Sequence, residues 1–90
     1  MSAEALRALG RAIRLTREEH GVEIPALAAE SGRRATYLRE LEAGRIDPDL
    51  ESLLVIPEAL ARLATDPGIR ASTLILRAEG LEREGARDAV

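Results

Sequence analysis

Glycine and proline signals divide this sequence into segments of helical length. Gly21, Gly32 and Gly44 each follow a stretch with helical spacing, and the pairs Asp47-Pro48 and Asp66-Pro67 have the form of turns that open a helix. Glycine after the last turn commonly ends a helix, whereas Asp at the N-cap followed by Pro commonly begins one. The intervening apolar residues recur every three or four positions, and no segment alternates as a strand would. These signals predict an all-α fold, a compact five-helix bundle.

The boundaries of the expected helices follow from the same signals. Leu6, Leu9 and Ile13 share one face of the first helix. Pro57 lies inside the fourth segment, where it lacks a donor and clashes with the preceding turn, so we expect a kink or break there. Residues 81–90 are small and charged, and we expect them to fray as a tail beyond a domain of residues 1–80. The five helices are expected at about residues 3–20, 25–31, 35–43, 50–64 and 67–79.

Composition limits the kind of core that the chain can build. Ninety residues suffice for one domain, and Tyr37 is the sole aromatic residue because there is no Phe or Trp. The core must therefore consist of aliphatic side chains, which suits packed helices better than a sheet.

The residue types present exclude several classes of function. There is no cysteine and only one histidine, His20, so disulfides, thiol nucleophiles and metal sites built on Cys or His clusters are excluded. Asp47 and Asp49 are better explained as residues that start a helix. We therefore expect no enzyme activity, no cofactor and no metal. No apolar run is long enough to span a membrane, and we expect a cytoplasmic protein with no membrane contact.

Charge is distributed unevenly along the chain. The net charge is −3, yet residues 1–45 carry eight Arg against seven Glu, whereas residues 46–90 carry five Arg against nine acids. All thirteen basic residues are arginine, the residue best suited to bidentate phosphate contacts. The C-terminal half should be repelled by phosphate. The basic character is greatest around Arg33, Arg34, Arg39 and Arg45.

A short second helix, a tight turn and a short third helix form a helix-turn-helix layout over about residues 25–43. The stretches LGRAIRLTREEHGV, LAAESG and TYLRELEAGRIDPDLESLL, within about residues 9–60, resemble the Cro/C1-type (XRE) helix-turn-helix family. The resemblance implies a lambda-repressor-like DNA-binding domain. The residues that carry it are Ile13, Arg17, Gly21, Leu27, Ala28, Gly32, Tyr37, Leu38, Leu41, Glu42, Gly44, Pro48, Leu50 and Leu53.

The resemblance implies a site on double-stranded DNA, with the third helix in the major groove. It implies a structural ion pair between Arg17 and Glu42, which removes one acid from the surface that would meet DNA. The base-facing positions are Arg34, Ala35, Thr36 and Glu40. The positions near phosphate are Arg33, Tyr37, Arg39 and Arg45.

Departures from the family pattern leave a second reading open, among them Thr16 in place of a usual leucine and Pro57 in place of a usual alanine. Ile24 occupies the position of a glutamine that bonds a phosphate and braces the third helix. Arg33 replaces a small apolar core residue, and Arg34 replaces a Ser or Thr cap. A protein with these departures could bind another regulator or the transcription machinery instead of DNA.

We expect the protein to act as a dimer, because one short helix reads too few base pairs for specificity. The function expected is that of a small, repressor-like transcriptional regulator that associates with the nucleoid through DNA. The alternative is a protein-interaction module with weak or no DNA binding. The dimer contact is expected on the last helix, through Ile69, Leu74, Ile75, Leu76 and Leu81.

Overall fold

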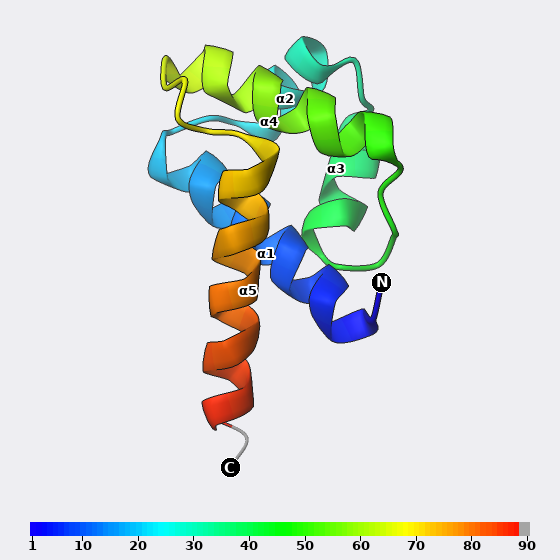
Figure 1. Ribbon diagram of the computed structural model, residues 1–90. Coiled ribbons are helices and arrows are strands. Elements are labelled where there is room, and N and C mark those ends of the chain that lie inside the picture. Colours follow the sequence, from blue (N-terminus) through cyan, green and yellow to red (C-terminus); the bar gives the residue numbers. More distant parts are fainter. Residues whose placement is uncertain (89–90) are drawn as a thin grey trace.

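The computed structural model describes residues 1–88, and within them it contains five α-helices and no strand. This confirms the predicted all-α architecture (Figure 1). The helices are α1 (Ala3–Glu19), α2 (Ile24–Ser31), α3 (Ala35–Glu42), α4 (Leu50–Ala64) and α5 (Ala71–Asp88).

The helices pack pairwise into a single bundle. Helix α1 packs against α3 and α5, whereas α2 packs against α3 and α4. Figure 1 shows α4 lying across one end of the molecule, and α5 running from beneath α4 past α1. The C-terminal half of α5 projects beyond the other helices, which accounts for the elongated dimensions of 40 × 23 × 21 Å.

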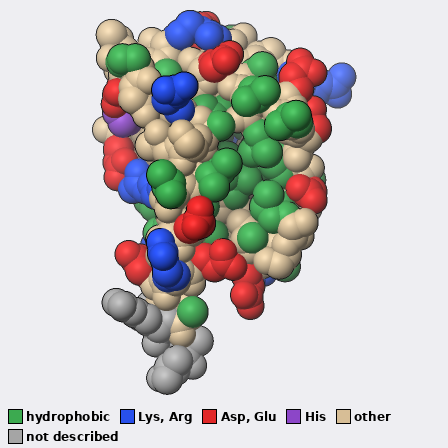
Figure 2. All heavy atoms as spheres, in the orientation of Figure 1, with side chains coloured by type: hydrophobic (Ala, Val, Ile, Leu, Met, Phe, Trp, Pro, Cys, Tyr) green, Lys and Arg blue, Asp and Glu red, His purple; other side chains and the backbone are tan. Residues whose placement is uncertain are grey.

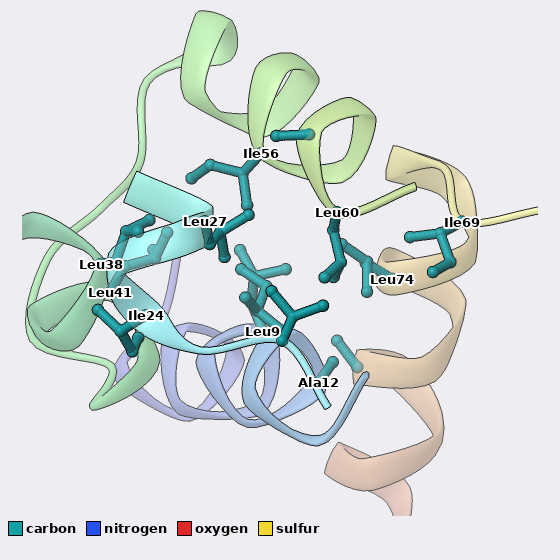
Figure 3. Packing of buried hydrophobic residues seen from close by; sticks show 14 of the residues in the cluster. Leu9, Ala12, Ile24, Leu27, Leu38, Leu41, Ile56, Leu60, Ile69 and Leu74 are labelled. Carbon is teal, nitrogen blue, oxygen red and sulfur yellow. The ribbon is translucent and has the colours of Figure 1, made fainter. Parts of the chain in front are cut away.

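The core consists of aliphatic side chains contributed by all five helices (Figure 3). Burial of these side chains is the main term that holds the helices together. Tyr37 packs at the edge of the core rather than within it. The largest fully buried hydrophobic residues are Leu27, Leu38, Leu41, Ile56 and Leu60.

Gly10 sets how closely α1 approaches the end of α3. A Cβ atom at this position would lie 2.3 Å from the carbonyl oxygen of Leu41 and 2.6 Å from that of Glu42. Both distances are far shorter than a van der Waals contact, and both oxygens belong to the backbone, which cannot turn aside as a side chain can. Only glycine therefore permits this packing of α1 on α3.

A three-residue turn separates α2 from α3. Gly32 caps α2 with a left-handed conformation, φ +69°, which glycine adopts at little cost. The Arg33 N–H donates to the carbonyl of Ala28 at 3.2 Å, and Arg34 is the extended N-cap residue of α3. This arrangement forms the predicted helix-turn-helix.

Three helix boundaries differ from the expectation. The last helix begins at Ala71 rather than at residue 67, because Asp66 and Pro67 belong to a turn in which the Gly68 N–H donates to Asp66 Oδ1. The break expected at Pro57 does not occur, since α4 continues from Leu50 to Ala64 and Pro57 is buried. Ile56 and Leu60 anchor the helix in the core on either side, so packing compensates for the single missing hydrogen bond. Helix α5 continues to Asp88, beyond the expected end at about residue 79, because Ala, Glu and Arg favour helix and Leu81 packs on the core. Residues 89–90 lie outside the described residues.

Candidate nucleic-acid interface

Helix α3 presents a narrow exposed face, and Arg34, Thr36, Arg39 and Ala43 are exposed along it. The opposite face carries Leu38 and Leu41 into the core. Helical spacing thus divides α3 into one anchoring face and one face that a partner can contact.

Four arginines cluster around α3, but only two of them lack an acidic partner among the described residues. Arg34 and Arg39 take part in none of the ion pairs found within residues 1–88. Arg45 Nη1 lies 3.2 Å from Glu40 Oε1, so these two charges offset each other. Glu40, expected to face the bases, is therefore paired within the protein.

Arg33, expected near phosphate, turns toward the start of α4. Its Nε donates to Ser52 Oγ at 2.8 Å, and its Nη2 lies 3.6 Å from Glu51 Oε1. Only 22% of its side chain is exposed. Arg33 is thus engaged inside the protein, unlike Arg34 beside it.

Ala35 and Tyr37 are half-buried and pack against the core. The Tyr37 hydroxyl donates to Asp49 Oδ1 at 3.4 Å. The sites expected for base and phosphate contact therefore divide into an exposed group on α3 and a group tied to α4.

The structure pairs Arg17 with Glu42, as the resemblance implied. Arg17 Nε and Nη2 donate to Glu42 Oε2 and Oε1 at 2.8 and 2.9 Å, and Arg17 Nη1 donates to the Val22 carbonyl at 2.9 Å. The hydrogen bond to Glu42 raises the pKa of Arg17 above its ordinary value against the opposing effect of burial. The pair fastens the end of α3 to α1.

At the start of α2, Ile24 is buried in the core. It occupies the position where the family places a glutamine, so the first turn of α2 offers no polar group there. Glu23 is the N-cap residue of α2, without a side-chain cap hydrogen bond.

Some of the residues expected to form the dimer contact on the last helix are buried in the protein's own core. Ile69 and Leu74 are 5% and 2% exposed, and both belong to the chain's own core. Leu81 packs against that core as well. Ile75 and Leu76 remain on the surface at 44% and 65% exposure. Three consecutive apolar residues on a helix point in different directions, so Leu74 faces inward while its two successors face outward.

An apolar surface lies where α4 meets α5. A hollow there is lined by Leu53 and Pro57 of α4, Ala71 and Ile75 of α5, and deeper core residues. Figure 2 shows hydrophobic side chains gathered on this face of the molecule. The hollow has a volume of about 10 Å³, space for roughly one water molecule, which is far too small for a small-molecule ligand.

The sequence pattern missed the polar group at the start of α4. Ser52 is buried and donates to Asp49 Oδ1 at 2.5 Å. The spacing of Asp49 and Ser52 across the first turn of the helix was a local signal that could have indicated a contact. The partnership with Arg33, 19 residues away, had no signal in the sequence.

Other site classes receive no support from the described residues. Within residues 1–88, no group of three or more His, Cys, Asp or Glu residues could hold a metal ion. In the same part of the chain, every helix is too short or too polar to cross a membrane.

The five helices, with α2 and α3 joined by a tight turn, define a compact all-α protein that contains a helix-turn-helix. A crystal structure of the clp gene regulator ClgR from Corynebacterium glutamicum is similar to it, with 30% identity and a TM-score of 0.83 over 94% of this chain and 83% of that chain. A second ClgR structure from C. glutamicum matches with 33% identity and a TM-score of 0.73, over 84% of this chain and 88% of the other. The chain belongs to the family of this regulator. No protein-family model and no curated protein matches the sequence.

Proposed function

We propose that this protein is a sequence-specific DNA-binding regulator of transcription, of the Cro/C1 (XRE) type, with α3 in the major groove. The observation that carries the proposal is the exposed face of α3, with Arg34 at its N-cap and Arg39 in its last turn, in a chain of the same family as a gene regulator. Arg34 suits a bidentate contact with guanine, and Thr36 suits contact with a thymine methyl group. Arg39 suits a phosphate at the edge of the groove.

Two copies of the chain form the DNA-binding unit in this proposal. The contact surface is the α4–α5 apolar face, which we define as Leu50, Leu54, Ala71 and Ile75, around the buried Pro57. Leu50, Leu54 and Ile75 are 72%, 49% and 44% exposed, and exposed apolar groups that gather on one face commonly mark an interaction surface.

Charge complementarity supports a second copy as the occupant of this face. Glu58 and Arg70 line the same groove beside the face, with Leu54, Pro57 and Ala71. Neither takes part in the ion pairs found among residues 1–88. In a two-fold symmetric contact, Glu58 of each copy can meet Arg70 of the other.

Selection of bound duplexes from a random DNA pool tests the proposed function. We expect enrichment of a palindrome whose half-sites are about one helical turn, roughly 34 Å, apart. The double change Arg34→Ala and Arg39→Ala should abolish enrichment. The matched control, Arg14→Ala with Arg83→Ala, removes the same charge from α1 and α5 and should preserve it. An unenriched pool at moderate salt would contradict the proposal.

The alternative is a protein-interaction module, and one observation favours it. Arg33 and Arg45 are both paired with acids of the protein itself, which reduces the positive charge available to DNA. Under this alternative the selected pool stays random, and the apolar face binds a different protein.

A further inference from the structure

Arg33 belongs to a polar network that joins the helix-turn-helix to α4. The Arg33 Nε donates to Ser52 Oγ at 2.8 Å, and Ser52 Oγ donates its one proton to Asp49 Oδ1 at 2.5 Å. The same Asp49 oxygen accepts from the Tyr37 hydroxyl at 3.4 Å. We call Arg33, Tyr37, Asp49 and Ser52 the α3–α4 clamp.

Every polar atom at the centre of the clamp is used. Ser52 is 1% exposed, and its hydroxyl both donates and accepts within the clamp. The hydrogen bond from Ser52, aided by the nearby charge of Arg33, holds the pKa of Asp49 below its ordinary value although burial opposes it. Arg33 and Asp49, which carry the opposite charges of the clamp, thus both hydrogen-bond to Ser52.

The clamp joins two helices that do not otherwise pack closely on each other. Helix α3 packs on α1 and α2, whereas α4 packs on α2 and α5. The clamp reaches across from α4 to the residue just before the N-cap of α3 and to its third residue, Tyr37. These two attachments lie on either side of Arg34 and Thr36, the exposed residues proposed to read bases.

We propose that Arg33 is a positioning residue for DNA recognition, which fixes the N-terminal turn of α3 through Ser52 and Asp49 rather than binding a phosphate itself. This inference rests on the proposed function. It also explains how α3 is braced when Ile24, buried in the core, supplies no polar group at the start of α2.

The competing role, in which Arg33 swings out to a phosphate, is physically unfavourable. The buried Ser52 oxygen would lose the donor that it faces, which is destabilising. Asp49 and Glu51 would also lose their nearby positive charge and would lie uncompensated beside DNA.

The variants Arg33→Lys and Ser52→Ala separate the two roles. Lysine retains the charge that a phosphate contact needs, but it lacks the Nε donor that faces Ser52. Alanine removes the clamp's centre without any change of charge. If Arg33 positions α3, both variants should lower the affinity ratio of selected to random duplexes by about tenfold, with the salt dependence of binding unchanged.

Amide hydrogen exchange in the absence of DNA provides a second readout, independent of the proposed function. Both variants should speed exchange at Leu38 and Leu41 of α3 by about tenfold, while Leu60 of α4 is unaffected. The double variant should show no further change, because both substitutions break the same link. Circular dichroism verifies that each variant folds.

Two results would overturn the inference. In the first, Arg33→Lys keeps the wild-type affinity ratio of selected to random duplexes and the wild-type rate of amide exchange, while Arg33→Met makes the slope of log K against log salt shallower by about 0.9 per subunit. The other is unchanged exchange in Ser52→Ala. If the wild-type protein binds no DNA, the proposed function fails, whereas the exchange measurement still decides whether the clamp holds α3.

Discussion

At the scale of single residues, the arginines differ in what they face. Arg17 is nearly buried against Glu42, their side chains being 11% and 8% exposed. Replacing Arg17 by Met leaves the Glu42 carboxylate without its partner, so we expect urea denaturation to show a loss of about 3 kcal/mol in the free energy of unfolding. The double variant Arg17→Met with Glu42→Leu should recover much of it. An exposed control, Arg14→Met, should change little, and an equally small effect at Arg17 would contradict the structural role.

Two exposed carboxyls make stability depend on pH. The hydrogen bond from Arg77 lowers the pKa of Glu19 below its ordinary 4.5, and that from Ser52 lowers the pKa of Asp49 below its ordinary 3.8. Since folding lowers both values, the stability they contribute is complete above the ordinary pKa and disappears as pH falls through the folded-state pKa.

This dependence can be measured by urea unfolding between about pH 6 and pH 3. The wild-type protein should lose more stability over this range than Glu19→Gln or Asp49→Asn, because each variant lacks one contributing carboxyl. Identical slopes in all three proteins would refute the assignment.

At the scale of elements, Gly10 determines how α1 and α3 pack. A methyl group there would meet two backbone oxygens, so Gly10→Ala should destabilise the protein by about 2 kcal/mol or more. Gly80 is the matched control. It lies within α5 with no atom within 4 Å of an added Cβ, so Gly80→Ala should stabilise by roughly 0.5–1 kcal/mol. Differential scanning calorimetry should show opposite shifts in Tm, and a rise at Gly10 would contradict the close approach.

The elements that could be predicted from sequence are those with local causes. The ends of α1, α2 and α3 follow from glycines and caps, which act within a few residues. The continuity of α4 through Pro57 and the burial of Ile69 and Leu74 depend on what other helices place beside them. The same holds for the candidate site. The exposure of Arg34 follows from its place in the turn and could be predicted locally, whereas the hydrogen bond from Arg33 to Ser52 depends on how the helices pack.

At the scale of the whole molecule, the α4–α5 apolar face gives a testable dimer. Leu54→Glu should convert a dimer to a monomer in sedimentation, because the buried carboxylate would lack a partner. Leu63→Glu is the control, because Leu63 lies nine residues after Leu54, which at 3.6 residues per turn places it on the opposite face of α4. A wild-type protein that stays monomeric at high micromolar concentration would remove the dimer from the proposal.

Salt dependence reports how many positive charges the whole dimer places on DNA. Four arginine charges per subunit placed on DNA, Arg34 in the groove and Arg33, Arg39 and Arg45 at phosphates, would give a slope of log K against log salt of about −7 for a dimer. Since Arg33 and Arg45 are paired with acids of the protein, we expect only Arg34 and Arg39 to contribute, with a slope of about −3.6. Titration of a selected duplex at several salt concentrations measures this slope. Arg39→Ala should make it shallower by about 1.8 in the dimer, whereas Arg45→Ala should not change it. A slope near −7 would mean that DNA draws Arg33 and Arg45 away from Glu51 and Glu40, and that the α3 surface rearranges on binding.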